Sequence, residues 1–140
     1  MAASSDRLSI FISYAREDGK DLALRLRDDL QTMGYTPWLD LSEIAGGGVW
    51  SQNIEDAIEN CDLMIALMSF GSYKSEYCRA EQLRAIRKGK RIVPVLVQKN
   101  ADRPIHLEHL NYLDFSNSSR YDDQLRDLLS DISAGQAFRP

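Results

Sequence analysis

Short apolar runs alternate with amphipathic segments along most of the chain. Three nearly continuous apolar runs, residues 8–14, 63–68 and 92–97, have the length and composition of strands buried on both faces. Two shorter strands are predicted over residues 36–39 and 111–115. Strands that alternate with helices need right-handed crossovers and form a parallel sheet covered on both sides. The chain is therefore predicted to be an α/β protein with a five-stranded parallel sheet.

Helical spacing of apolar residues predicts the elements between these strands. Helices are expected over residues 18–33, from residue 50 to about 61, from Ser75 onwards, and from Tyr121 to just before Gly135. Gly34 is a candidate C-cap for the first helix, and residues 69–74 are predicted to be a turn. Pro94 lacks a ladder donor, so a bulge or a free strand edge is expected there. The strand order 2-1-3-4-5, as in flavodoxin-like folds, is the expected arrangement.

The chain length of 140 residues fits one domain. We expect residues 1–7 to be a disordered N-terminal lead, residues 8–134 to be the domain, and residues 135–140 to be a linker or chain end. The longest wholly apolar run is too short to cross a membrane, and the N-terminus lacks the pattern of a secretion signal, so a cytoplasmic protein is expected. Cys61 and Cys78 fall in apolar helical patterns and are predicted to be buried, reduced thiols.

The charge distribution argues against direct binding to nucleic acid, since the net charge is −4 at pH 7. A local basic cluster, predicted to lie around the last turn of the Ser75 helix, consists of Arg84, Arg87, Lys88, Lys90 and Arg91. Cations near the end of a helix complement its dipole. We favour that structural interpretation over a phosphate-binding patch.

Other polar motifs give weaker signals. Gly46, Gly47 and Gly48 lack the spacing of a P-loop or a dinucleotide fingerprint, so residues 40–48 are interpreted as a mobile loop, with phosphate contact as the alternative. His106 and His109 lack the partners of a zinc site. The pair at residues 28 and 29 lies in mid-helix, away from the strand ends where a receiver domain is phosphorylated.

Glu81 is the leading candidate for chemistry. It lies at the border of an apolar helix stripe, three residues after Cys78 and four after Tyr77. Ligands in such sheets bind beyond the carboxyl ends of the strands at the switch point, which here is between strands one and three. We predict that Glu81 is partly buried beside that cleft, the alternative being a solvated helix glutamate.

Several motifs occur at compatible spacings, namely FISYAR (11–16), WLD (38–40), GGVW (47–50), SEYCRAE (75–81) and GKRIVPV (89–95). Together they resemble the motifs of TIR domains, particularly bacterial ones. The resemblance runs from about residue 8 to residue 132 and implies a flavodoxin-like α/β sandwich. Many prokaryotic, plant and axonal members cleave NAD+ to nicotinamide and ADP-ribose or a cyclic isomer, whereas animal receptor and adaptor members mainly assemble signalling scaffolds.

The resemblance implies that Glu81 is the catalytic residue. The sequence around Glu81 departs from the family's motif at two positions: Tyr77 replaces a commoner Trp, and Gln82 replaces a commoner aliphatic residue. The match further implies substrate contacts and no metal or cofactor, because NAD+ is the substrate. The implied substrate-binding residues are Tyr14, Ala15, Arg16, Asp40, Ala45, Trp50 and Tyr77.

Three functions remain as hypotheses. The leading one is an NAD+ glycohydrolase or cyclase that becomes active when TIR domains self-associate into a homo-oligomer or filament. The domain could act alone or be fused to a sensor domain in a longer protein, with a role in immunity or virulence. The second is a non-enzymatic module that recruits other TIR domains. The third is another flavodoxin-like N-glycoside enzyme, such as a deoxyribosyltransferase.

Overall fold

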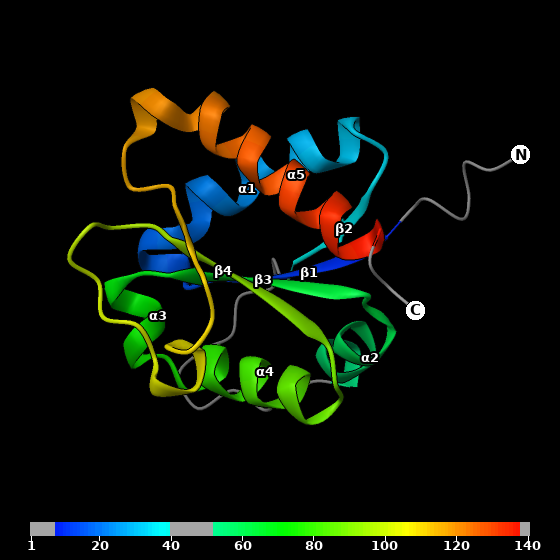
Figure 1. The fold of residues 1–140 in the computed structure, drawn as a ribbon. Helices are drawn as coiled ribbons and strands as arrows, with labels where there is room; N and C mark the ends of the chain where they lie inside the picture. The colour runs from blue at the N-terminus through cyan, green and yellow to red at the C-terminus, as the bar shows by residue number, and fades with distance from the viewer. Residues whose placement is uncertain (1–7, 40–51, 138–140) are drawn as a thin grey trace, which may run out of the picture.

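Five parallel strands form a single sheet with helices on both faces (Figure 1). The computed structural model describes residues 8–39 and 52–137 of the chain. The strand order β2-β1-β3-β4-β5, with every neighbouring pair parallel, confirms the predicted topology. The strands are β1 (Ser9–Ser13), β2 (Thr36–Trp38), β3 (Leu63–Met68), β4 (Arg91–Leu96) and β5 (Leu113–Asp114).

The helices divide into two layers. Helices α1 and α5 cover one face of the sheet, whereas α2 and α4 cover the other (Figure 1). Their bounds, with the two short 3-10 turns η2 and η3, are α1 (Arg16–Thr32), α2 (Gln52–Asn60), α3 (Phe70–Lys74), α4 (Glu76–Arg87), η2 (Ile105–Leu107), η3 (Ser118–Arg120) and α5 (Tyr121–Ala137). None of the helices in the described parts of the chain combines the length and the apolarity needed to cross a bilayer.

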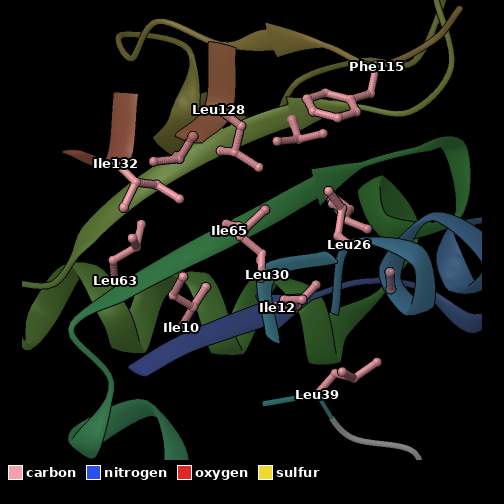
Figure 2. Close-up of a cluster of buried hydrophobic side chains, with 14 of the residues drawn as sticks. Ile10, Ile12, Leu26, Leu30, Leu39, Leu63, Ile65, Phe115, Leu128 and Ile132 are labelled. Atoms are coloured by element: carbon pink, nitrogen blue, oxygen red, sulfur yellow. The ribbon is translucent and has the colours of Figure 1, made fainter. Parts of the chain in front are cut away.

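Alternate side chains of the strands enter two separate cores. Ile10 and Ile12 of β1 and Ile65 of β3 pack beneath α1 and α5, together with Leu26 and Leu30 of α1 (Figure 2). The intervening residues of the same strands, such as Phe11 and Met64, pack beneath α2 and α4. All six residues of β3 are buried, which explains why this strand reads as a continuous apolar run.

Most element boundaries agree with the sequence predictions to within two residues, but two regions differ more. Residues 70–74, predicted as a turn, form helix α3, because Ser69 and Ser72 make a reciprocal capping box at its start. Gly135 was expected to lie beyond the last helix, in a linker or chain end from residue 135 onwards. Instead α5 continues through Gly135 to Ala137. Gly34 follows the end of α1 with φ of +96°, as expected of a glycine C-cap. The predicted lead at residues 1–7 lies outside the described residues.

Pro94 lies in β4 at a position that is paired with β3 but, among the described residues, not with β5. The register of β4 with β3 runs without interruption from Arg91 to Leu96 and aligns Pro94 with Ala66. Pairing with β5 begins only at Val95. The expected free edge is therefore present at Pro94, and the proline costs the sheet no bond to β5.

Asp18 ties the first turn of α1 to the end of β3. Its Oδ1 accepts a hydrogen bond of 2.6 Å from Oγ of Ser69, and its Oδ2 accepts one of 2.8 Å from the backbone N–H of Gly71. A Cβ built on Gly71 would lie 2.7 Å from Oδ1 of Asp18 and 3.2 Å from Cβ of Ala15. Only glycine therefore lets the chain approach the carboxylate this closely.

We expect Gly71→Ala to lower the free energy of unfolding by about 1–3 kcal/mol, because the added methyl group displaces Asp18 from both hydrogen bonds. Gly19→Ala is the matched control. Its Cβ would meet Cβ of Tyr14 at an ordinary 3.5 Å, and Gly19 is the fourth residue of α1, so a gain of up to about 1 kcal/mol is expected. Urea titration of both variants measures the difference. Equal stabilities of the two variants would contradict the role given to Gly71.

Candidate active site

Helix α4 starts at a side-chain cap and turns one face onto the sheet. Oγ of Ser75 accepts a hydrogen bond of 3.1 Å from the backbone N–H of Cys78, which satisfies one of the free donors in the first turn. The buried residues of α4 are Cys78, Glu81, Gln82 and Ala85. Their spacing of three or four residues defines the inner face of the helix, and Glu81 lies on it.

Glu81 is a buried acid held against the end of β1. Its side chain is only 7% exposed, and its Oε1 accepts a hydrogen bond of 2.8 Å from Oγ of Ser13. Ser13 is the last residue of β1 and lies 68 positions earlier in the chain. The acid is thus placed at the carboxyl edge of the sheet beside strands β1 and β3. The alternative of a solvated helix glutamate is wrong, while the catalytic role of Glu81 stays a prediction.

Part of the predicted substrate site gathers around this acid. Tyr14, Ala15 and Arg16 follow Ser13 directly, in the turn from β1 into α1, where Ala15 is buried and the two flanking residues are half-buried. Tyr77 is half-buried and lies one turn before Glu81 on α4. These residues are brought to the same edge of the sheet as Glu81.

The remaining predicted contacts are not described. Asp40, Ala45 and Trp50, together with the loop predicted over residues 40–48, lie outside the described residues. A cavity of about 610 Å³ elsewhere on the carboxyl edge is lined by Lys99, which follows β4, and by residues from β5 to α5, including Asp114 and Gln124. Its lining does not include Glu81, so this hollow is distinct from the predicted cleft.

The thiol beside Glu81 is not a nucleophile. Cys78 is 2% exposed, and burial, reinforced by the nearby Glu81 carboxylate, raises the pKa of its thiol to about 12. The raised pKa favours the protonated thiol, which is a poorer nucleophile than the thiolate. Burial also raises the pKa of Cys61, and both cysteines are free and buried, as predicted.

Gln82 makes a contact that the sequence analysis missed. It is 1% exposed, and its Oε1 lies 2.8 Å from Nε2 of His106 in η2, so that the Nε2–H tautomer donates to the amide oxygen. From the sequence, Gln82 was noted only as the replacement of a commoner aliphatic residue. A buried amide needs a polar partner, and the histidine supplies it by linking α4 to the segment after β4. An amide at an apolar helix position was the signal that such a partner exists.

His106 gives a prediction for acid stability. Burial, and next the guanidinium of Arg79, hold the pKa of its imidazole below the ordinary value, so the unfolded chain binds the proton more tightly than the folded one. The contribution of the neutral His106 ring to the free energy of unfolding is fully present above a pH of about 6.5. This contribution is lost as the pH falls through the pKa that His106 has in the folded protein.

We therefore expect the melting temperature to fall less between pH 7 and pH 5 in His106→Gln than in the wild type, since glutamine keeps an N–H for Gln82 without titrating. The exposed His109→Gln is the control and should keep the wild-type slope. Scanning calorimetry at several pH values measures the slopes. Parallel curves for all three proteins would contradict the assignment to His106.

Several cations of the basic cluster, which spans the end of α4 and the start of β4, form ion pairs within the domain. Arg84 pairs with Glu55 at 3.0 Å and Glu59 at 2.7 Å, both on α2, and Lys88 also pairs with Glu59. Arg91 pairs with Asp131 of α5. Arg84 and Arg87 lie in the last turn of α4, as the helix-dipole interpretation expects, and the ion pairs in addition join neighbouring elements.

The sequence matches a known family over most of its length. The model of the family described as TIR domain matches residues 10–129. A curated relative from Brachypodium distachyon, the probable 2′ cyclic ADP-D-ribose synthase BdTIR, is 30% identical over 95 residues, which are 67% of this chain and 42% of that protein. The chain thus spans about two fifths of the relative's length.

Solved structures share the fold. The TIR domain of the Toll-related receptor TRR-2 from Hydra magnipapillata superposes with a TM-score of 0.72 at 27% identity, over 89% of this chain and 97% of that chain. The TIR domains of the activated Roq1 resistosome, which recognises the effector XopQ, give 0.69 at 16% identity over 89% and 99%. The CMP N-glycosidase BcmB of Clostridium botulinum gives 0.60 at 24% identity over 86% and 98%. The last two likenesses concern the fold alone.

Proposed function

This chain belongs to the TIR domain family, and on that premise we propose that it cleaves the N-glycosidic bond of NAD+ with Glu81 as the catalytic residue. One observation carries the proposal. Glu81 is an acid that is 7% exposed, lies at the carboxyl edge of a parallel sheet and accepts a hydrogen bond from Ser13 at the end of β1. Burying a carboxylate is costly unless its surroundings hold it, and such arrangements concentrate at functional sites.

A single carboxylate suits the chemistry of this substrate. Glycosidases that expel an alcohol use a second carboxylic acid to protonate the leaving oxygen. Nicotinamide needs no such proton, because its ring nitrogen is cationic while bonded to ribose and takes the bonding electron pair as it leaves neutral. Positive charge then develops on the ribose. A fixed carboxylate next to the ribose stabilises that charge more in the transition state than in the ground state.

The fate of the ribosyl cation decides the product. Attack by water on C1′, with loss of one proton to solvent, gives ADP-ribose. Attack by a nucleophile within the same molecule gives a cyclic isomer. The relative from Brachypodium distachyon is named as a probable synthase of a 2′ cyclic product, which supports including cyclisation in the proposal. The other chemical candidates beside Glu81 are weaker, since Cys78 is held as a thiol.

Self-association is part of the proposal. Leu83 and Ile86 lie on the outer face of α4 and are 45% and 42% exposed. They are three residues apart on a helix whose inner face carries Glu81, so a contact at this surface would bear directly on the helix that presents the acid. We propose that assembly with other copies of the domain raises the activity.

The test follows nicotinamide release by chromatography. Concentrated protein, with and without a crowding agent, is incubated with NAD+, and the second product is separated as ADP-ribose or a cyclic isomer. We expect release that rises more steeply than protein concentration. A protein that associates, as measured by light scattering, and yet releases no nicotinamide at any concentration would overturn the proposal.

That last outcome would favour a second function, a non-enzymatic module that recruits other TIR domains. The exposed pair Leu83 and Ile86 is the observation in its favour. In that case Leu83→Ser should abolish association while Glu81→Gln leaves it unchanged. Transfer of a sugar between nucleosides, without turnover of NAD+, would instead identify a deoxyribosyltransferase-like enzyme.

A further inference from the structure

We infer that Ser13 is a positioning residue for the reaction: its hydroxyl orients the Glu81 carboxylate toward the ribose. The inference rests on the proposed function and adds a residue to it. The observation is a hydrogen bond of 2.8 Å from Oγ of Ser13 to Oε1 of Glu81, buried and joining two elements that are 68 residues apart in sequence.

The geometry gives Ser13 a rigid base. Ser13 is 1% exposed and ends β1, where it aligns with Ala66 of the fully buried strand β3. Its backbone is therefore held by the centre of the sheet. A side chain with one rotatable bond to its hydroxyl, mounted on such a strand, leaves little freedom in the position of Oγ.

The side chain of Glu81, the partner of Ser13, is by contrast flexible. A glutamate reaches from its helix through three torsions, and the last one, which rotates the carboxylate plane, has broad preferences. A helix alone therefore does not fix the direction in which Glu81 presents its charge. The hydroxyl of Ser13 anchors one carboxylate oxygen and so restricts the rotation of the carboxylate. A charge-assisted bond of this kind is stronger than a neutral one.

Cys78 completes the packing around this bond. Its buried thiol lies close enough to interact with the hydroxyls of both Ser13 and Ser75 and with the carboxylate of Glu81. The thiol is therefore part of the buried surroundings of the Ser13–Glu81 contact. Glu81 is thus surrounded by Ser13 at the end of β1 and by residues of the first turn of its own helix.

The test compares three substitutions at one position under the conditions in which the wild type turns over NAD+. Ser13→Ala removes the hydroxyl, Ser13→Cys replaces it with a weaker donor of similar shape, and Ser13→Thr keeps it. We expect kcat for nicotinamide release to fall about 10- to 100-fold in Ser13→Ala with KM within about twofold of wild type, because orientation and not substrate affinity is lost. Ser13→Cys should fall between Ala and Thr, and Thr should recover most of the activity.

A double variant separates positioning from direct substrate contact. If Ser13 acts through Glu81, adding Ser13→Ala to Glu81→Gln should change the residual rate by less than about twofold. Additive losses would overturn the inference. Circular dichroism checks that each variant is folded, and if Ala fails to fold, the ranking of Thr above Cys decides.

The outcomes separate this inference from the function on which it rests. Wild-type turnover that Glu81→Gln abolishes and Ser13→Ala leaves intact would overturn the role of Ser13 alone. A wild type without turnover, or one equal to Glu81→Gln, would overturn the proposed function and this inference with it.

Discussion

Replacing Glu81 with glutamine is expected to reduce nicotinamide release from NAD+ by about 10²- to 10³-fold, the loss typical of removing one preorganised electrostatic group from an active site. The amide has nearly the shape of the carboxylate and keeps an oxygen that can accept from Oγ of Ser13, 2.8 Å away in the wild type. The charge that would stabilise the ribosyl cation is lost, while the packing of α4 is kept. The measurement is kcat under assembling conditions, with a melting curve of each protein.

Glu76→Gln supplies the control for this experiment. Glu76 is on the same helix, in its first turn, and its side chain is exposed. Its replacement removes the same charge from the same element but away from the buried face, so kcat should stay within about twofold of wild type, with a stability loss of a few tenths of a kcal/mol from the helix dipole. Equal losses in both variants would show that the net charge of α4, and not the placement of Glu81, controls the rate.

The fold could be predicted because its strongest determinants are local. The run of six apolar residues at 63–68 became β3 with the predicted bounds, and Gly34 ended α1 as expected. The misplaced end of α5 has a local explanation too. A glycine inside a helix costs only about 1 kcal/mol, so Gly135 did not force the helix to end.

The candidate site was predictable only in part, because its contacts join distant segments. The position of Glu81 followed from helical phase, since Cys78, Glu81 and Ala85 share the buried face of α4. The hydrogen-bond donor to Glu81 could not be predicted, because nothing in the spacing of residues links Ser13 to a position 68 residues later. The contact between Gln82 and His106 was missed for the same reason. Side-chain pairing across a sheet edge depends on strand order and register together.

The largest loss of stability is expected at the centre of the sheet. Ile65 is fully buried in β3, aligned with Ile12 on one side and Val93 on the other, and it belongs to the cluster beneath α1 and α5 (Figure 2). Ile65→Ala removes buried methyl and methylene groups from strands that are held on both sides and cannot easily close the gap. We expect a loss of about 2–5 kcal/mol, a large share of the 5–15 kcal/mol typical of domains.

Urea titration tests this expectation, and the midpoint should fall with the m-value unchanged. Ile105→Ala is the matched control, since this isoleucine is 86% exposed in η2 and should change stability by less than about 0.5 kcal/mol. The result also bears on the site, because β3 aligns with Ser13 through Ala66. In Ile65→Ala, kcat measured well below the melting temperature should fall less than in Glu81→Gln, as the acid itself is retained. Equal midpoints for the two isoleucine variants would contradict the assignment of the core to this cluster.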